Sequence, residues 1–205
     1  MSTFDWESFL KQESKKAIEQ FKKRKKKYEE QWSKDWWFSL PDEALESEWL
    51  GFPGASEEQI VAAETRLGTT LPPSYRDFLK VTNGWLDYPS IIELWPIEKI
   101  DWFSVENQEW IDIWLDYCPE EASDEEYFNY KYDWWYWTQP IRTKYMQTAL
   151  QISGDDDSEV VLLNPKIIHN DEWEAWLFSS HHAGINRCRS FQEMLQKIGM
   201  PGPWT

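Results

Sequence analysis

The fold of this chain is decided by residues 50–84, which read LGFPGASEEQIVAAETRLGTTLPPSYRDFLKVTNG. The segment opens with glycine and proline turn residues. Ser56 is followed three positions later by Gln59, which is the spacing of a helix capping box. Apolar residues then recur at helical spacing as far as Leu67. Because Gly68 can adopt a left-handed conformation at a helix end, the sequence predicts one helix between Ser56 and Gly68.

A second helix is predicted directly after the first. It starts at Leu71-Pro72-Pro73, because proline suits the first helical turn, and it ends at Asn83-Gly84, because both residues tolerate a positive φ. Its apolar face holds Tyr75, Phe78, Leu79 and Thr82. A DNA-reading hairpin needs basic residues on its second helix, whereas Arg76 and Lys80 stand beside Asp77 here. We therefore do not expect this hairpin to read DNA.

The rest of the chain predicts one long helix, three shorter helices and several strands. Residues 4–32 place apolar residues at helical spacing with lysine and glutamate between them. Further helices are predicted at 42–49, at 105–118 (with Trp110, Ile113, Trp114 and Tyr117 at helical spacing) and at 191–198, where Ser190 is the cap. Strands are predicted at 91–95, 145–152, 159–163 and 172–178, the last with Trp173 and Trp176 on opposite faces, and residues 154–158 are predicted to form a hairpin loop. This order predicts an α+β fold with a mostly antiparallel sheet flanked by helices, and an extra N-terminal helix.

The charge is strongly negative and unevenly placed. The net charge is −16; residues 1–27 hold nine basic and four acidic residues, a net +5, which leaves −21 for the remainder. A surface with this much negative charge repels nucleic acid and attracts basic proteins. We therefore expect a protein partner and no direct contact with nucleic acid. The run Lys22–Lys27 can touch phosphates or a membrane surface, but a solvated helix face on an acidic body is the simpler interpretation.

The composition includes 16 tryptophans, of which we expect some to be partly exposed as partner anchors, although filling the core explains most of them. The two cysteines make neither a disulfide framework nor a zinc site. No apolar run approaches the roughly 18–20 residues of a membrane span, and the N-terminus has no signal-peptide pattern. The expectation is a soluble, cytoplasmic protein without a membrane partner.

Motifs that carry chemistry are missing from the sequence. There is no phosphate-binding glycine loop and no nucleophile elbow. The histidines, His169, His181 and His182, have no spaced catalytic companion. The Asp155–Asp157 run lacks calcium-loop spacing, because Val160 stands where glycine is required. We therefore predict no catalytic residue, no metal, no cofactor and no enzyme activity.

The motifs of residues 50–84 resemble the SUKH superfamily, which includes the yeast Smi/Knr cell-wall regulator. The resembling positions are a helix with Ile60 and Glu64, then Leu71-Pro72, Tyr75-x-x-Phe78-Leu79 and Asn83-Gly84. Weaker likeness extends over about residues 45–199, through Gly154-Asp155-Asp156, Val160–Pro165 and Ser190-Phe191-x-x-x-Leu195. The resemblance implies an α+β fold and, in bacteria, immunity to polymorphic or contact-dependent toxins, many of them nucleases or nucleic-acid deaminases. It implies no shared catalytic site, and Glu64 is expected to cap or bridge locally.

The sequence departs from this family in its N-terminal helix and in an acidic, aromatic insertion at residues 119–137. We predict that residues 1–40 form a basic amphipathic helix with a Trp-rich connector, and that residues 41–205 form the SUKH-like domain. The predicted function is an immunity protein that binds a cognate toxin; a regulatory scaffold and an enzyme with clustered carboxylates are the alternatives. The candidate partner-binding residues are Glu120, Glu121, Asp124, Glu125, Glu126, Asp133, Trp134 and Trp135, with Asp155, Asp156 and Asp157 second.

Overall fold

The computed structural model describes residues 4–31, 40–86, 93–118, 121–128, 141–154, 159–179 and 184–198. Within them the strands form one five-stranded antiparallel sheet in which each strand pairs with the next along the chain, which confirms the α+β prediction. The strands are β1 (Asp101–Trp102), β2 (Leu150–Gln151), β3 (Glu159–His169), β4 (Glu172–Ser179) and β5 (Gly184–Cys188). The helices are α1 (Trp6–Gln31), α2 (Asp42–Ser47), α3 (Glu57–Leu67), α4 (Pro73–Val81), α5 (Phe103–Glu106), α6 (Gln108–Tyr117), α7 (Asp124–Tyr127), the 3-10 helix η1 (Thr143–Thr148) and α8 (Phe191–Ile198).

The α3–α4 hairpin follows the local signals in the sequence. The Gln59 amide donates to Ser56 Oγ at 3.3 Å and the Ser56 amide donates to Gln59 Oε1 at 2.8 Å, so the capping box is complete. Gly68 ends α3 with φ 68°, and Pro73 is the first residue of α4. Gly54 is required for close approach, since a Cβ there would lie 2.0 Å from the Lys80 carbonyl oxygen. These contacts confirm both predicted helices.

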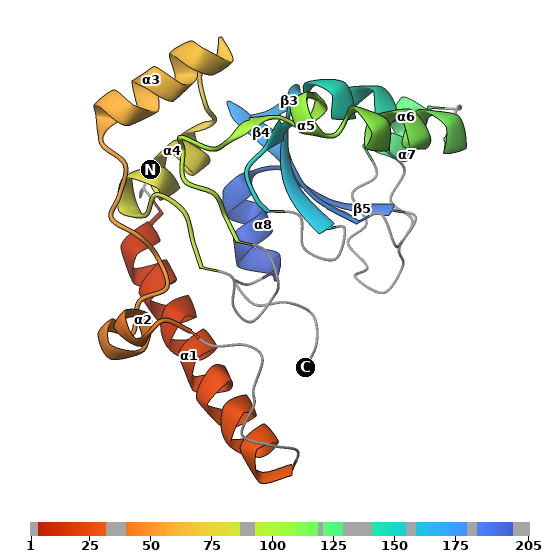
Figure 1. The fold of residues 1–205 in the computed structure, drawn as a ribbon. Coiled ribbons are helices and arrows are strands. Elements are labelled where there is room, and N and C mark those ends of the chain that lie inside the picture. The colour runs from red at the N-terminus through yellow and green to blue at the C-terminus, as the bar shows by residue number, and fades with distance from the viewer. Residues whose placement is uncertain are drawn as a thin grey trace.

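The sheet lies between two layers of helices (Figure 1). Val161, Leu163 and Trp173 point to one face, where they join a core built from α1, α4 and α8. Val160, Leu162, Trp176 and Phe178 point to the other face, where α5, α6 and η1 cover them. Trp173 and Trp176 therefore lie on opposite faces of β4, as the strand alternation predicts.

Helix α1 packs its apolar stripe on the body and then leaves it. Trp6 stacks on Phe191 with ring centroids 5.9 Å apart, and the Leu50 amide donates to Ser14 Oγ at 3.2 Å. The last residue of this helix that the structure shows as buried is Phe21. In Figure 1 the helix runs past α2 and away from the sheet. The N-terminal helix predicted from residues 4–32 is confirmed.

The structure corrects several predicted elements. Residues 145–152 are not one strand: η1 occupies the first part, because Met146 and Ala149, three residues apart, both bury against the sheet. Within the predicted strand 91–95, the described Leu94 forms only isolated bridges, to Trp85 and Ser153. The helix predicted at 105–118 is divided at Asn107. Strand β5 had no prediction, and of the predicted hairpin loop at 154–158 only Gly154 is described.

Candidate protein-binding face

Four of the predicted partner-binding residues lie within the described part of the chain. Glu121, Asp124, Glu125 and Glu126 are all exposed, on α7 and just before it. The remaining residues lie outside the described ranges: Glu120, Asp133, Trp134, Trp135, Asp155, Asp156 and Asp157. The acidic start of the insertion is therefore the part of the predicted site that has a described geometry.

Helix α7 begins with a second complete capping box. Ser123 Oγ accepts from the Glu126 amide at 3.3 Å, and Glu126 Oε2 accepts from the Ser123 amide at 3.0 Å. The side-chain and backbone hydrogen bonds from Ser123 lower the pKa of Glu126, so this carboxylate stays charged. Asp124 and Glu125 extend from the same turn into solvent. The cap thus fixes a short helix that presents negative charge.

Tyr127 anchors α7 to the sheet from below. Its hydroxyl donates to Glu174 Oε2 at 2.6 Å, and the Arg187 guanidinium carbon lies 3.8 Å from the centre of its ring. Burial is the main cause that raises the pKa of Tyr127, followed by the charge of Glu174. The phenol therefore remains a hydrogen-bond donor at neutral pH, and α7 is held on the underlying strands.

The acceptor of that bond, Glu174, is part of a fully buried ion pair. Arg187 Nη1 donates to Glu174 Oε1 at 2.9 Å, and both side chains have an exposed fraction of 0%. Glu174 Oε2 also accepts from Asn164 Nδ2 at 3.1 Å and from Trp176 Nε1 at 2.7 Å. A buried charge is tolerated only when it is paired and hydrogen-bonded, and this carboxylate meets both conditions. The cluster ties β3, β4, β5 and α7 together.

Helix η1 supports both α7 and α6. Arg142 donates through Nε to the Ala122 carbonyl at 3.0 Å and pairs with Asp124, while Lys144 pairs with Glu121. The hydrogen bond to Asp124 is the main cause that raises the pKa of Arg142. At the other end of η1, Gln147 Nε2 donates to Gln108 Oε1 of α6 at 2.9 Å. The two helices consequently share one rigid support.

The outer side of α6 was missed by the sequence analysis. Trp110 and Trp114 point inward, each with its ring centroid 5.2 Å from that of Phe178. Ile113 and Tyr117, which share their helical spacing in the sequence, are exposed instead, Tyr117 to 83%. The positions of the acidic residues could have identified this exposed side. Glu109 and Asp116 lie one helical turn before and after Ile113, and Asp112 precedes it.

These elements together form what we call the α6–α7 face. It consists of exposed carboxylates that alternate with exposed apolar side chains: Glu106, Glu109, Asp112, Asp116, Glu121, Asp124, Glu125 and Glu126, with Ile113 and Tyr117. In Figure 1, α5, α6 and α7 form a green band at one side of the sheet. The arrangement suits contact with a positively charged protein surface that also offers an apolar patch.

The described tryptophans contribute mainly to the core. Four are buried and five are half-buried, and none of these nine is exposed. The core interpretation of tryptophan is therefore the correct one for them. Trp134 and Trp135 of the predicted site lie outside the described residues, so their role as anchors stays a prediction. On the described α6–α7 face, the exposed aromatic ring on α6 is that of Tyr117.

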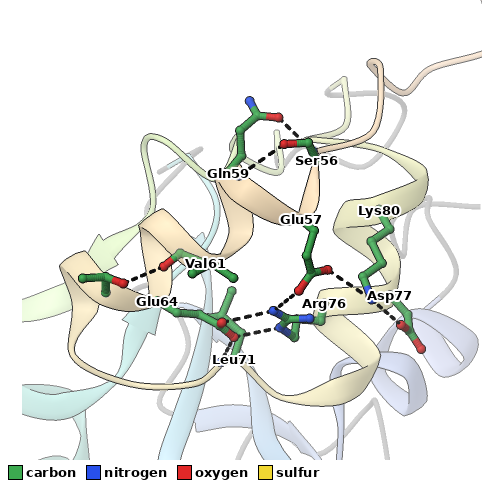
Figure 2. Close-up of polar contacts among 10 residues, drawn as sticks. Ser56, Glu57, Gln59, Val61, Glu64, Leu71, Arg76, Asp77 and Lys80 are labelled. Atoms are coloured by element: carbon green, nitrogen blue, oxygen red, sulfur yellow. Dashed lines mark hydrogen bonds and ion pairs between the residues drawn. The ribbon is translucent and has the colours of Figure 1, made fainter.

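A second polar cluster joins α3 to α4, and Figure 2 shows it. Glu64 Oε1 accepts from the Leu71 amide at 2.9 Å and from Arg76 Nε at 2.8 Å, and Arg76 Nη2 also donates to Glu57 at 2.7 Å. Burial opposes ionisation of Glu64, but the hydrogen bonds from Arg76 and Leu71 outweigh it and lower the pKa of this carboxyl. All partners are internal, as expected for a residue that bridges locally.

Other possible sites in the described part of the chain offer few groups that could bind a ligand or catalyse a reaction. An open groove of about 590 Å³ lies between the start of α1, residues 49–53 and the end of α4, but its Lys11 is already paired with Glu7 at 2.5 Å. Among the described residues, no three His, Cys, Asp or Glu side chains are grouped to hold a metal ion. No helix among them is long and apolar enough to cross a membrane. Burial raises the pKa of the Cys188 thiol to about 12, so it is not a nucleophile.

The fold and the motifs of the α3–α4 hairpin define the class of this chain as an α+β protein with an antiparallel sheet. Residues 54–197 match the SMI1 / KNR4 family (SUKH-1), and the chain belongs to that family. No curated protein matches the chain. The match includes the α6–α7 face and the α3–α4 hairpin, whereas α1 and α2 lie before it.

Proposed function

We propose that this protein binds and neutralises a cognate protein toxin in the cytoplasm, through the α6–α7 face and without catalysis. The observation that carries the proposal is the alternation of exposed carboxylates with Ile113 and Tyr117 on a surface supported by η1. The family resemblance supports it, because bacterial members act as immunity proteins and have no shared catalytic site. A toxin that acts on nucleic acid fits this face, because such a protein presents a basic surface.

The two kinds of side chain have separate roles in this binding. Carboxylates attract a basic partner from a distance and accelerate encounter, which makes the association rate depend on salt. Exposed apolar groups supply affinity once they are desolvated, and a central anchor contributes roughly 2–4 kcal/mol on truncation. Tyr117 is the strongest anchor candidate because of its ring and its exposure. Binding therefore needs both the carboxylates and the exposed apolar side chains.

The experiment starts by identifying the gene next to this one in the genome and testing any toxin domain that it encodes. Co-expression with this chain should prevent toxicity, and titration calorimetry should show a complex of the two purified proteins. The double substitution Ile113→Ala and Tyr117→Ala should weaken binding by roughly 30-fold or more, as loss of a hot spot does. Substitution of Asp112 and Asp116 by Asn should mainly slow association and reduce its dependence on salt.

The matched control uses exposed apolar residues elsewhere. Ile168→Ala together with Val61→Ala truncates two exposed apolar side chains on β3 and α3 and should leave affinity unchanged. Failure to neutralise the neighbouring toxin, combined with capture of several unrelated cellular proteins, would instead support the regulatory scaffold of the fungal branch. Equal losses for both double variants would exclude the α6–α7 face as the contact surface.

A further inference from the structure

The second half of α1 carries six consecutive basic residues, Lys22–Lys27, immediately after the last residue shown as buried. Lys22, Lys23, Lys25, Lys26 and Lys27 are exposed. The ten residues from Lys22 to Gln31 extend the helix by about 15 Å at the usual rise. This segment holds six basic residues and two acidic ones, Glu29 and Glu30, so it projects a net positive charge from a protein that is acidic as a whole.

Three lysines of this segment, Lys22, Lys23 and Lys27, differ in their pairing from several lysines elsewhere in the chain. Ion pairs hold Lys11, Lys16, Lys80, Lys144 and Lys197 to nearby carboxylates. Lys22, Lys23 and Lys27 form no ion pair with any residue that the structure describes, although the chain has 37 acidic residues. Solvated cations crowded together repel one another, so a polyanion that neutralises them gains free energy from the contact.

The distribution of the charges around the helix indicates which kind of polyanion it can bind. Successive helical residues are rotated by roughly 100°, so six in a row place cations on every side of the helix. A flat membrane would meet only one side, and the apolar stripe that could insert into lipid is already packed in the core through Leu10, Ile18 and Phe21. The major groove of a DNA duplex has phosphates along both walls and admits one α-helix, which matches charge on all sides.

The acidic body does not prevent such a contact. The expectation of no direct nucleic-acid contact follows from the summed charge of the chain, whereas Figure 1 shows that the second half of α1 extends away from the sheet and from α6 and α7. Charges are largely screened beyond about 8 Å at physiological salt. Lys27 lies about 9 Å along the helix past Phe21 and Gln31 about 15 Å, so a duplex at the outer lysines is separated from the body by about one screening length or more.

We propose that the projecting half of α1 binds the phosphate backbone of a nucleic-acid duplex without sequence preference, with the helix lying in a groove. Phosphate contacts by lysine supply affinity and a strong salt dependence but no base recognition. The segment lies before residues 54–197, so this activity is an addition to the family domain. It is independent of the toxin-binding proposal, because the two use different surfaces.

The test is fluorescence anisotropy of a labelled DNA duplex of arbitrary sequence, titrated with the full chain between about 50 and 200 mM salt. Five exposed lysines predict a slope of about −4 to −5 in the plot of log affinity against log salt. The triple substitution of Lys22, Lys23 and Lys27 by Gln should make the slope shallower by about 3 and weaken low-salt binding at least tenfold. Glutamine keeps helix propensity, and circular dichroism checks that α1 is retained.

The control removes the same number of charges elsewhere. Substitution of Lys99, Lys166 and Lys197 by Gln lowers the net charge equally and should leave the slope unchanged within about 1. The proposal is overturned if the unsubstituted chain does not bind the duplex at the lowest salt, or if both triple variants lose affinity equally. Tighter binding to phosphatidylglycerol vesicles than to duplex would replace it with a membrane site. Salt-sensitive self-association without duplex binding would replace it with contact between copies.

Discussion

Two carboxylate–arginine pairs of similar length stand in opposite environments. Arg187 and Glu174 meet at 2.9 Å with both side chains 0% exposed, whereas Arg76 and Glu64 meet at 2.8 Å with 20% and 13% exposed. The buried pair lies beneath α7, and the second pair lies at the edge of the α3–α4 hairpin. The two ion pairs therefore have similar geometry, but the first is excluded from water and the second is partly accessible to it.

The comparison shows what each pair does for the fold. Water can solvate part of Arg76 if Glu64 is lost, so that pair adds modest stability to a hairpin already held by caps and apolar contacts. Arg187 has no such compensation, because removal of either buried charge strands the other in a low-dielectric interior. The buried cluster therefore fixes the position of α7, whereas the hairpin pair only reinforces the packing of α3 on α4.

The largest effect is expected from Arg187→Met. The substitution leaves Glu174 buried without its cation and should lower the free energy of unfolding by about 3–5 kcal/mol, measured by urea denaturation. The double variant with Glu174→Met removes both charges and should recover part of that loss. A loss below about 1 kcal/mol in the single variant would show that the pair is not effectively buried.

Tyr127→Phe tests the anchor of α7 alone. Loss of the hydroxyl leaves Glu174 Oε2 with one donor fewer, and we expect about 1–3 kcal/mol lower stability. Hydrogen exchange of the Tyr127 amide, which donates to the Ser123 carbonyl at 2.8 Å, should accelerate as α7 loosens. Tyr117→Phe is the matched control, since that exposed ring should lose less than about 0.5 kcal/mol. Equal effects in both variants would contradict an anchoring role for Tyr127.

The two pairs also differ in how far they could be predicted. Glu64 and Arg76 lie twelve residues apart in a segment whose caps and turns follow from local signals, so a local bridging role is readable from the sequence. Glu174 and Arg187 meet because β4 and β5 pair in a register that sets Trp176 opposite Arg187, and β5 itself gives no strong strand signal. Sequence periodicity does not predict contacts of this kind, because they depend on strand register and on how an insertion docks.

The same distinction applies to the candidate site. The acidic run at Glu121–Glu126 is visible as composition, and the structure shows its described residues exposed. The outer side of α6 was missed because Ile113 and Tyr117 share helical spacing with Trp110 and Trp114, and spacing alone does not say which side meets the sheet. Helix η1 was predicted as a strand because its short run of alternating residues fits both periods.

Glu64→Gln should have a moderate effect that depends on pH. Near pH 7 the loss of the charged partner should lower stability by about 1–2 kcal/mol. The folded state lowers the pKa of Glu64, so its contribution is complete above the unfolded value of 4.5 and disappears as pH falls through the lower folded value. Urea midpoints of the two proteins should therefore converge in acid. A difference that persists unchanged below about pH 3 would contradict the ionic contribution.

Glu172→Gln should have the smallest effect, within about 1 kcal/mol, and the opposite dependence on pH. Burial, with the nearby charges of Asp77 and Asp171, raises the pKa of Glu172 although Ser74 donates to it through its amide at 2.8 Å and its hydroxyl at 2.6 Å. A raised folded pKa gives a contribution that is complete below 4.5 and is lost as pH rises through the folded value. As pH rises above 4.5, the unsubstituted chain should therefore lose stability relative to Glu172→Gln, whereas its gain in stability relative to Glu64→Gln develops below 4.5 and is complete there. Parallel pH profiles for the two variants would mean that hydrogen bonding, and not burial, controls ionisation at Glu172.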